Sequence, residues 1–316
     1  MIHYYPNKEI NKRKWDECIS SSVNGRIYAY SWYLDCVADQ WAALVFGNYQ
    51  AVFPLPYRTK WGLKYVYQPV FTQQLGLFSK IKITPSLVED FIKNIPAQFK
   101  YINLNLNQHN RLYTKSFRVE SKQNIEMDLL ADYSILRSNY STNLKRNLKK
   151  ATEAKLTIFE NLKPDAVIRL FRENKENQSG YFSPADYTRL LRLIYKALQL
   201  GHAEVWGAYT SENNLCCGAI FLRSHKRLTF LFSGTDKDAR KNAALPFMLN
   251  AFIEANANKE LVFDFEGSNY SSLARFYLGF GGQTISYAQI HILQSAAILR
   301  PVLKSYLFFR AKRRLV

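Results

Sequence analysis

The stretch from Leu261 to Gly282 holds the residues with the clearest capacity for chemistry. It opens with a short apolar run, residues 261–263, which has the composition of a strand buried on both faces. Asp264 and Glu266 follow, separated by one residue, so on an extended strand both carboxylates share one face. Open α/β sheets bind their ligands just beyond the carboxyl ends of such strands. An acid pair in that place could take a proton from an amine.

A polar turn and a helix follow the acid pair. Ser268 and Asn269 lie in the turn, and Arg275 lies on the helix together with Tyr277. Ser268, Asn269 and Arg275 are candidate substrate-binding residues. The helix is predicted to begin at 270–272, where serines can cap it, and to end at the paired glycines 281–282.

The plainer interpretation is that Asp264 and Glu266 form an ordinary polar strand end. Charge distribution argues against it. Residues 267–316 contain no further Asp or Glu but seven Arg and Lys. A lone acid pair beside so basic a segment favours a functional placement.

Length, composition and charge limit the classes of protein. A chain of 316 residues usually forms two domains, although one large α/β domain also fits. Because 47% of the residues are hydrophobic, global disorder is excluded. The formal charge of +18 favours polyanionic partners, namely nucleic acid, anionic lipid surfaces or phosphorylated small molecules.

Several chemistries are disfavoured by the absence of their motifs. The four cysteines and five histidines show no metal-ligand spacing, and no nucleophile elbow or Walker loop occurs. We therefore expect no metal site and no permanently bound cofactor. The first residues lack the apolar core of a signal peptide, and no stretch reaches the ~18 apolar residues of a membrane span. The sequence predicts a soluble, cytoplasmic protein, attached at most to a membrane surface.

The first part of the chain has the pattern of an antiparallel meander preceded by two helices. In residues 101–107, Ile102, Leu104 and Leu106 alternate with asparagines, which predicts one packed face and one solvated face. The predicted helices are 11–22, 31–40 and 85–95, and the predicted strands are 41–46, 51–57, 63–67, 101–107 and 117–129.

A change of composition at Asp132 marks a predicted domain boundary. The helix that follows has an apolar stripe with a spacing of four, formed by Leu136, Tyr140, Leu144 and Leu148. Its other face is cationic, and no acid occurs from 133 to 152, so phosphates are natural counterions. The alternative is a merely solvated helix surface. The phosphate-binding candidates on this helix are Lys145, Arg146 and Lys149.

The second part of the chain repeats the order of the first. A strand at 156–160 leads to helices after 164 and 184, three strands at 203–209, 215–222 and 228–233, a helix at 239–257, and then the opening strand. The sequence thus predicts domains at 1–132 and 133–292. A basic helix at 293–316 is expected to pack on the first of them.

This order resembles the GNAT acyltransferase fold in two tandem copies, the arrangement of the Fem group of peptidoglycan-bridge aminoacyltransferases. Fem-like proteins carry segments resembling NYSTNLKRNLKKA and FSGTDKDARKNAALPFML, and a helix ending like Phe280-Gly281-Gly282. The resemblance implies an α/β (α+β) protein with two GNAT-like domains, each a mostly antiparallel mixed sheet flanked by helices. The N-terminal copy is expected to be degenerate, since nothing in it corresponds to the acid pair.

The resemblance also implies an activity and roles for residues. An acyl or aminoacyl group would pass from a phosphate-bearing co-substrate, acyl-CoA or aminoacyl-tRNA, to an amine on a small molecule or a cell-wall precursor. Glu266 would act as the base. Asp264 would hold the ammonium or orient Glu266, and Tyr277 would protonate the leaving group.

The donor loop leaves the co-substrate open. GNAT enzymes that use acyl-CoA cradle its pyrophosphate in a loop with two glycines, whereas this chain has Ala243 and Leu245 at those places. The loop therefore cannot approach a phosphate as closely. Arg240, Lys241 and Asn242 are its phosphate-binding candidates.

A function of another class fits the same composition. A non-catalytic protein of this fold could bind nucleic acid or an anionic membrane through its basic faces. Its partners would be tRNA or the inner membrane surface. The sequence does not specify the oligomeric state.

Overall fold

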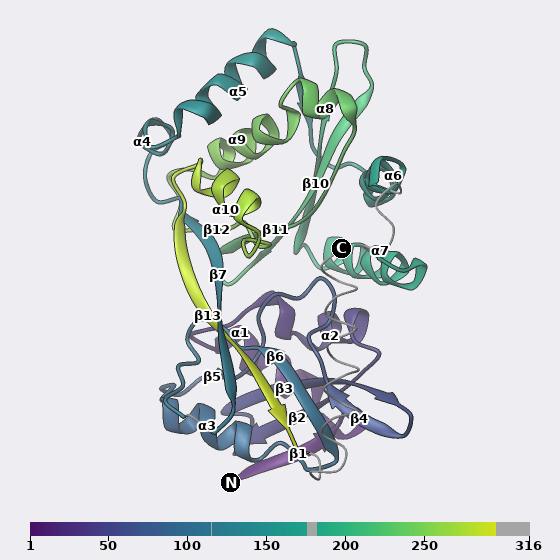
Figure 1. Ribbon diagram of the computed structural model, residues 1–316, viewed down its shortest axis with the longest axis vertical. Coiled ribbons are helices and arrows are strands. Elements are labelled where there is room, and N and C mark those ends of the chain that lie inside the picture. Colours follow the sequence, from purple (N-terminus) through teal and green to yellow (C-terminus); the bar gives the residue numbers. More distant parts are fainter. Residues whose placement is uncertain (115, 176–181, 295–316) are drawn as a thin grey trace. The chain divides into compact units, whose positions relative to one another are not determined.

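The computed structural model describes residues 1–114, 116–175 and 182–294. These residues form two compact units (Figure 1). Unit 1 comprises Met1–Lys122, Gly180–Leu190 and Ser286–Val316, and unit 2 comprises Gln123–Ser179 and Leu191–Ile285. Within the described ranges, no helix has the length and apolar composition needed to cross a membrane.

Three elements are shared between the units, because the chain passes from one unit to the other within them. They are β7 (Arg118–Asp128), α7 (Pro184–Gln199) and β13 (Gln283–Leu293).

Unit 1 is built on a mixed sheet with the strand order β1-β2-β3-β4-β6-β13. Its β2, β3 and β4 form the predicted antiparallel meander, and β4 then pairs with β6 in parallel. A short β5 pairs with β3. The strands are β1 (Ile2–Pro6), β2 (Gln40–Phe46), β3 (Ala51–Lys60), β4 (Leu63–Val66), β5 (Phe78–Ser79) and β6 (Phe99–Asn105), and the helices are η1 (Asn7–Glu9), α1 (Lys12–Ser21), η2 (Ile27–Ala29), α2 (Ser31–Val37) and α3 (Pro85–Lys93).

Local signals fix the helices of unit 1. The Asn11 side chain accepts a hydrogen bond from Lys14 N at 3.1 Å and so caps α1. Thr84 caps α3 in the same way, and Pro85 occupies its first turn, where a missing N–H costs nothing. The apolar face of α3 buries Phe91, whose ring stacks on Phe53 of β3 at 6.1 Å.

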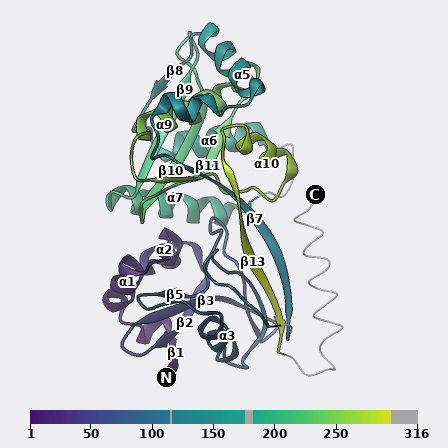
Figure 2. The same cartoon turned by 90° about the vertical axis from the view of Figure 1, so that its left-hand side faces the viewer.

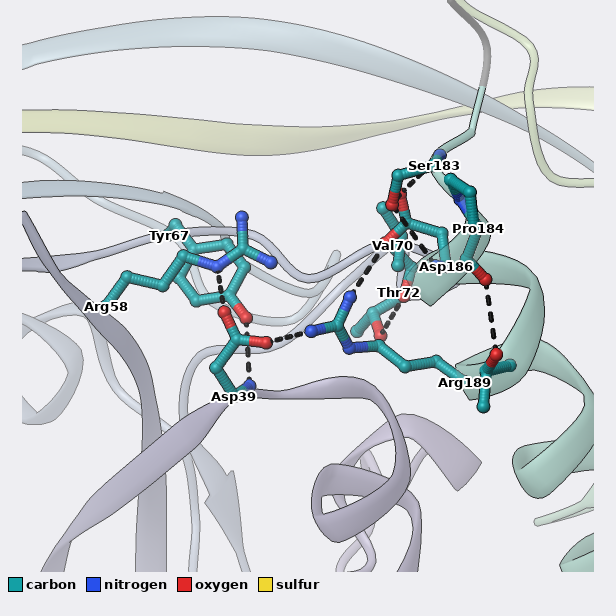
Figure 3. A network of polar contacts seen from close by, with 10 residues as sticks. Asp39, Arg58, Tyr67, Val70, Thr72, Ser183, Pro184, Asp186 and Arg189 are labelled. Carbon is teal, nitrogen blue, oxygen red and sulfur yellow. Dashed lines mark hydrogen bonds and ion pairs between the residues drawn. The ribbon is translucent and has the colours of Figure 1, made fainter.

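The beginning of α7 belongs to unit 1 and is held there by an ion network (Figure 3). Asp39 is paired with both Arg58 of β3 and Arg189 of α7. Phe182, just before the helix, packs on Phe71 with the ring centroids 4.9 Å apart. Polar and aromatic contacts therefore both join this segment to the sheet of unit 1.

Within the described residues, the strands of unit 2 form the other part of this 13-stranded sheet, in the order β7-β12-β11-β10-β9-β8. All neighbouring strands in this part are antiparallel except β11 and β12, which are parallel. The strands are β8 (Thr157–Phe159), β9 (Ala203–Tyr209), β10 (Leu215–Ser224), β11 (Arg227–Thr235) and β12 (Val262–Asp264), and the helices are α4 (Tyr133–Ser138), α5 (Thr142–Glu153), α6 (Pro164–Lys175), α8 (Lys237–Lys241), α9 (Ala244–Asn256) and α10 (Ser271–Leu278).

Helices cover both faces of this sheet (Figures 1 and 2). On one face lie α5 and α9, where Phe252 of α9 stacks on Phe221 of β10 at 3.6 Å. On the other face lies α6, which approaches so closely that a Cβ on Gly218 would lie 2.6 Å from Val167. In each unit, strands of mixed direction are therefore flanked by helices, as predicted.

The predicted helix at 239–257 is wrong as a single element. It is divided into α8 and α9 at Asn242 and Ala243, because Ala243 has the left-handed φ of 55°. No glycine stands at this position to indicate the break.

The predicted solvated face of residues 101–107 is present only in part. Asn107 is fully buried, and Asn103 and Asn105 are only partly exposed. Both residues make hydrogen bonds to other side chains. Gln289 of β13 donates to the side-chain Oδ1 of Asn103 at 2.8 Å, and the backbone N of Asn105 donates to Gln68 Oε1 at 2.9 Å. Burial therefore alternates as predicted from 102 to 106, and the prediction is wrong at Asn107.

The predicted boundary after Asp132 lies beyond β7, whereas the compact units divide within β7. The predicted basic helix at 293–316 lies, apart from its first two residues, outside the described residues.

Candidate active site

The parallel strands β11 and β12 separate at the place where the chemistry was predicted. They pair over three positions only, ending at Thr229 with Asp264. Beyond this pair β11 continues to Thr235, whereas β12 ends. The chain after Asp264 therefore turns away from β11, and the residues of the turn lie where two sheet strands part.

A buried ion cluster lies beneath this turn. Asp264 is fully buried and faces Glu126 directly across the β7–β12 pair. Two carboxylates opposite one another would repel. Arg227 of β11 pairs with both of them, at 3.3 Å from Asp264 Oδ2, and Asn124 donates to Asp264 Oδ1 at 2.8 Å. Burial alone would lower the pKa of Arg227, but the two carboxylates outweigh it and raise that pKa.

The prediction that Asp264 and Glu266 share a strand face is therefore wrong. The strand ends at Asp264, and Glu266 has a left-handed φ of 51°. Phe265, between them, points into the core and is 1% exposed. What links the two acids is a backbone contact, since Glu266 N donates to Asp264 Oδ1 at 3.1 Å. Asp264 thus fixes the conformation of the turn that carries Glu266.

Tyr277 lies close to this turn, on α10. Its ring stacks on Phe265 with centroids 4.9 Å apart, and the residue is only 6% exposed. Burial raises the pKa of Tyr277, and the nearby Glu266 carboxylate raises it further. The phenol therefore keeps its proton throughout the neutral range, as a proton donor must.

The remaining residues of the turn shape it. Ser268 is fully buried and donates to Glu266 O at 2.8 Å. Asn269 Oδ1 accepts from Gln123 N of β7 at 3.0 Å. Of the three predicted substrate-binding residues, Asn269 and Arg275 are exposed and Ser268 is buried. Ser268 and Asn269 hold the loop in place.

The end of α10 connects the turn to the basic helix. Gly279 O accepts from Ser141 N, the cap residue of α5, at 2.9 Å. Gly281 has φ of 82°, and a Cβ on it would lie 3.1 Å from Asn139 Cβ. The predicted glycine termination is present, although α10 already ends at Leu278 and its N-cap, Tyr270, makes no side-chain cap bond. The expected serine cap is wrong.

The predicted phosphate-binding residues lie on α5 and at the α8–α9 junction. Lys145, Arg146 and Lys149 are all exposed on α5, as predicted. Each has a neighbour on the same stretch of chain: Lys145 donates to Ser138 O at 2.9 Å, Arg146 donates to Asn143 Oδ1 at 3.4 Å, and Lys149 lies 3.9 Å from Glu153. The cationic face is therefore accessible to a large anion. The predicted helix with the stripe from Leu136 to Leu148 is wrong as a single element, because α4 ends at Ser138 and α5 begins at Thr142.

At the α8–α9 junction, Arg240 and Lys241 are exposed and Asn242 is partly so. Asp236 caps α8 by accepting from Ala239 N at 2.7 Å. Ala243 adopts the left-handed conformation that usually calls for glycine, so the loop has a glycine-like backbone but carries a methyl group.

Sequence reasoning missed Arg227, Glu126 and Asn124. A signal for Arg227 existed, because an arginine at the start of an otherwise apolar strand needs a buried partner. Its partners lie on strands distant in sequence and could not be read from local spacing. Among the described residues, no cluster of His, Cys, Asp or Glu could hold a metal ion.

Comparison with protein families matches a segment that contains part of this site, including Glu266 but not Tyr277. Residues 138–272 match the acetyltransferase (GNAT) domain family. The chain carries a GNAT acyltransferase domain. The matched residues of this GNAT domain include α5, the α8–α9 junction, β12 and the turn with Glu266.

Solved structures share the fold over nearly the whole chain. FemX is 11% identical with a TM-score of 0.63, covering 93% of this chain and 98% of its own. L-PGS from Bacillus licheniformis is 10% identical with a TM-score of 0.59, covering 96% and 97%. A tandem GNAT protein from the clavulanic acid biosynthesis pathway is 8% identical with a TM-score of 0.51, covering 94% and 100%. By sequence comparison, no curated protein matches the chain.

Proposed function

We propose that unit 2 transfers an acyl group to an amine, with Glu266 as general base and Tyr277 as general acid. The observation that carries the proposal is the position of Glu266. It occupies a left-handed turn where β11 and β12 part, it is anchored through its amide to Asp264, and it lies close to Tyr277. Left-handed non-glycine residues that the surroundings hold in place are concentrated at functional sites.

The chemistry follows from these positions. The amine nitrogen attacks the carbonyl carbon of an ester or thioester, and its proton passes to the Glu266 carboxylate. The tetrahedral intermediate then collapses. The bond to the leaving oxygen or sulfur breaks as the Tyr277 hydroxyl gives that atom a proton. Proton exchange with solvent restores both groups, and each such proton transfer contributes roughly 100- to 10,000-fold in rate.

Asp264 acts in this scheme through position and not through contact with substrate. Its carboxylate is occupied by Arg227, Asn124 and the Glu266 amide. Of the two roles predicted for it, orientation of Glu266 has the support of these contacts. Ser268 and Asn269 assist by fixing the same turn.

We propose aminoacyl-tRNA as the donor. The exposed Lys145, Arg146 and Lys149 on α5 offer a surface for a phosphate backbone. The methyl group of Ala243, in a position that favours glycine, makes the loop a poor cradle for a pyrophosphate. The resemblance to the Fem group and the shared fold with FemX add support. Acyl-CoA is the second candidate, since the α8–α9 junction still presents Arg240, Lys241 and Asn242.

The acceptor that fits the Fem-like resemblance is an amine on a cell-wall precursor. Such an acceptor places the enzyme in the cytoplasm, in contact with the inner membrane surface. The shared fold with L-PGS is compatible with an acceptor at a lipid surface.

The test measures transfer from aminoacyl-tRNA, and separately from acyl-CoA, to a panel of amines. Glu266→Gln and Tyr277→Phe should each lower kcat by about 100-fold or more while leaving the melting temperature nearly unchanged. Glu260→Gln, at an exposed carboxylate paired with Lys226, is the matched control. Tyr195→Phe serves the same purpose for the tyrosine. If both active-site variants transfer like wild type with every donor, the catalytic assignment is wrong.

A non-catalytic binding function is the alternative that the exposed face of α5 favours. It predicts salt-dependent binding of tRNA or anionic vesicles and no transfer with any donor. Charge reversal at Lys145, Arg146 and Lys149 would then abolish binding, and Glu266→Gln would have no effect.

A further inference from the structure

A second surface, on unit 1, combines an exposed aromatic ring with cations. β3 and β4 form a hairpin whose connecting residues are Trp61 and Gly62. Their φ values of 50° and 74° are both left-handed, the geometry of a two-residue type I′ turn. Trp61 lies at the tip and is 74% exposed.

Trp61 is an unexpected residue for this position. Type I′ turns favour Asn, Asp or Gly, because a bulky residue is strained at a left-handed φ. An indole that is three-quarters exposed also contributes little to the packing of unit 1. The residue is therefore explained better by what it meets outside the molecule than by the fold.

One lysine contacts the indole, and a second lies on the facing strand. Lys60 Nζ lies 4.6 Å from the centroid of the Trp61 ring, and Lys64 on the facing strand lies 5.6 Å from the Tyr57 ring. The sequence has no Asp or Glu from 40 to 88, so no acid of this stretch neutralises the tip. Leu63, paired with Lys60 across the turn, adds a partly exposed apolar side chain.

We propose that this hairpin tip, residues 60–64, docks unit 1 on an anionic lipid bilayer. Tryptophan is enriched at membrane–water interfaces, where its amphipathic ring sits among the headgroups. Lysines beside it are attracted to anionic headgroups. Lys60 and Lys64 thus meet the headgroups while Trp61 and Leu63 enter the interface.

The geometry favours a bilayer over RNA. Proteins that bind single-stranded RNA use a cationic groove with several stacking rings. A two-residue turn protrudes and offers one ring at its apex. The tip also differs from the basic face of α5, whose apolar residues Leu144 and Leu148 are buried in unit 2 and cannot enter a membrane.

This inference does not depend on acyl transfer by unit 2. It concerns attachment, and it can be measured with no substrate present. Its failure and the failure of the proposed activity are therefore separate results.

The test is cosedimentation of the full chain with vesicles of phosphatidylcholine containing about one third phosphatidylglycerol. Trp61→Asn should weaken binding about tenfold. It creates Asn-Gly, the preferred pair for this turn, so the melting temperature should stay the same or rise. Lys60→Gln with Lys64→Gln should weaken binding about 25-fold, because each lysine contributes a factor of about five.

The controls remove comparable side chains elsewhere on unit 1. Tyr113→Asn deletes a ring that is 77% exposed, and Lys93→Gln deletes an exposed lysine, and neither should change binding. Trp61→Tyr should retain most of the affinity. The proposal is overturned if wild type does not bind these vesicles, or if the hairpin variants bind them as wild type does. It is also overturned if the hairpin variants lose affinity for tRNA and not for vesicles.

Discussion

Units 1 and 2 each contain a short pair of parallel strands, but different residues lie beyond the pair. In each, two parallel strands pair over only three positions: β4 with β6 in unit 1, and β11 with β12 in unit 2. In unit 1 the space beyond the pair is bridged by the chain's own amides. Asn105 N donates to Gln68 Oε1, and Asn105 Nδ2 donates to Gln73 O, both at 2.9 Å.

In unit 2 the corresponding place carries the turn with Glu266 beside Tyr277. In unit 1 the hydrogen bonds of Asn105 to Gln68 and Gln73 hold the loop 68–74 in place. In unit 2 the stabilising contacts lie beneath the turn, in the cluster of Arg227, Asp264 and Glu126. In unit 1 the contacts beyond the strand pair are structural, whereas in unit 2 the same place carries the proton acceptor and donor of the proposed mechanism. The degeneracy of the first copy stays a prediction.

The largest expected effect comes from breaking the buried cluster of unit 2. Arg227→Met leaves two buried carboxylates facing each other and should destabilise unit 2 by about 3–5 kcal/mol. Hydrogen exchange should accelerate in β7 and β12 and remain slow in β6 of unit 1. Arg227→Lys, which keeps the positive charge, should lower the stability of unit 2 by less. Unchanged exchange in β12 of Arg227→Met would contradict the role given to the cluster.

A smaller effect is expected from breaking the hydrogen bond between the backbone N of Asn105 and the Gln68 side chain in unit 1. Gln68→Ala removes the acceptor of the Asn105 amide and should destabilise unit 1 by about 1–2 kcal/mol. Transfer activity should not change, because this hydrogen bond is structural. Gln50→Ala, at an exposed glutamine, is the control for loss of a side-chain amide. Loss of transfer with intact stability would mean that unit 1 has a site of its own.

Acidification should destabilise unit 1 through His291. Burial lowers the pKa of His291, and Arg118 and Lys122 lower it further, while Glu120 opposes them. Tyr101 Oη lies 3.1 Å from its Nδ1. Because the unfolded chain has the ordinary pKa of 6.5, it binds the proton more readily below that pH than the folded unit does.

The stability of unit 1 should therefore fall as the pH drops below 6.5. Thermal unfolding followed between neutral and mildly acidic pH measures this slope. His291→Gln should flatten it. An equal slope in the variant would assign the acid sensitivity to other groups.

The smallest effect is expected at the network that holds the start of α7 on unit 1. Asp39→Asn weakens its pairs with Arg58 and Arg189, which are partly exposed, and should cost about 0.5–1 kcal/mol. Faster hydrogen exchange in residues 182–190 and a smaller effect at high salt would be its signature. Asp90→Asn breaks an exposed ion pair on α3 and is the control, because it should leave hydrogen exchange in residues 182–190 unchanged.

Much of the fold was predictable because its signals are local. The apolar stripe of Leu144 and Leu148 placed α5 and exposed its lysines, and the meander at 41–67 followed from alternating apolar runs and turn residues. The break at Ala243 was not predictable, since an alanine in a left-handed conformation leaves no mark in composition. The burial of Asn107 was missed because a polar face can be covered by other amides.

The order of residues is enough to predict that an acid pair follows a buried strand and precedes a helix with Tyr277, and that basic residues gather on one helix face. Which acid is structural follows from the folded arrangement alone. Asp264 meets Arg227 and Asn124 because three strands come together in one register, and Asn124 is 140 residues away along the chain. Spacing along a chain fixes which residues are neighbours on one element, whereas the partner of a buried charge is fixed by the strands that pair beside it.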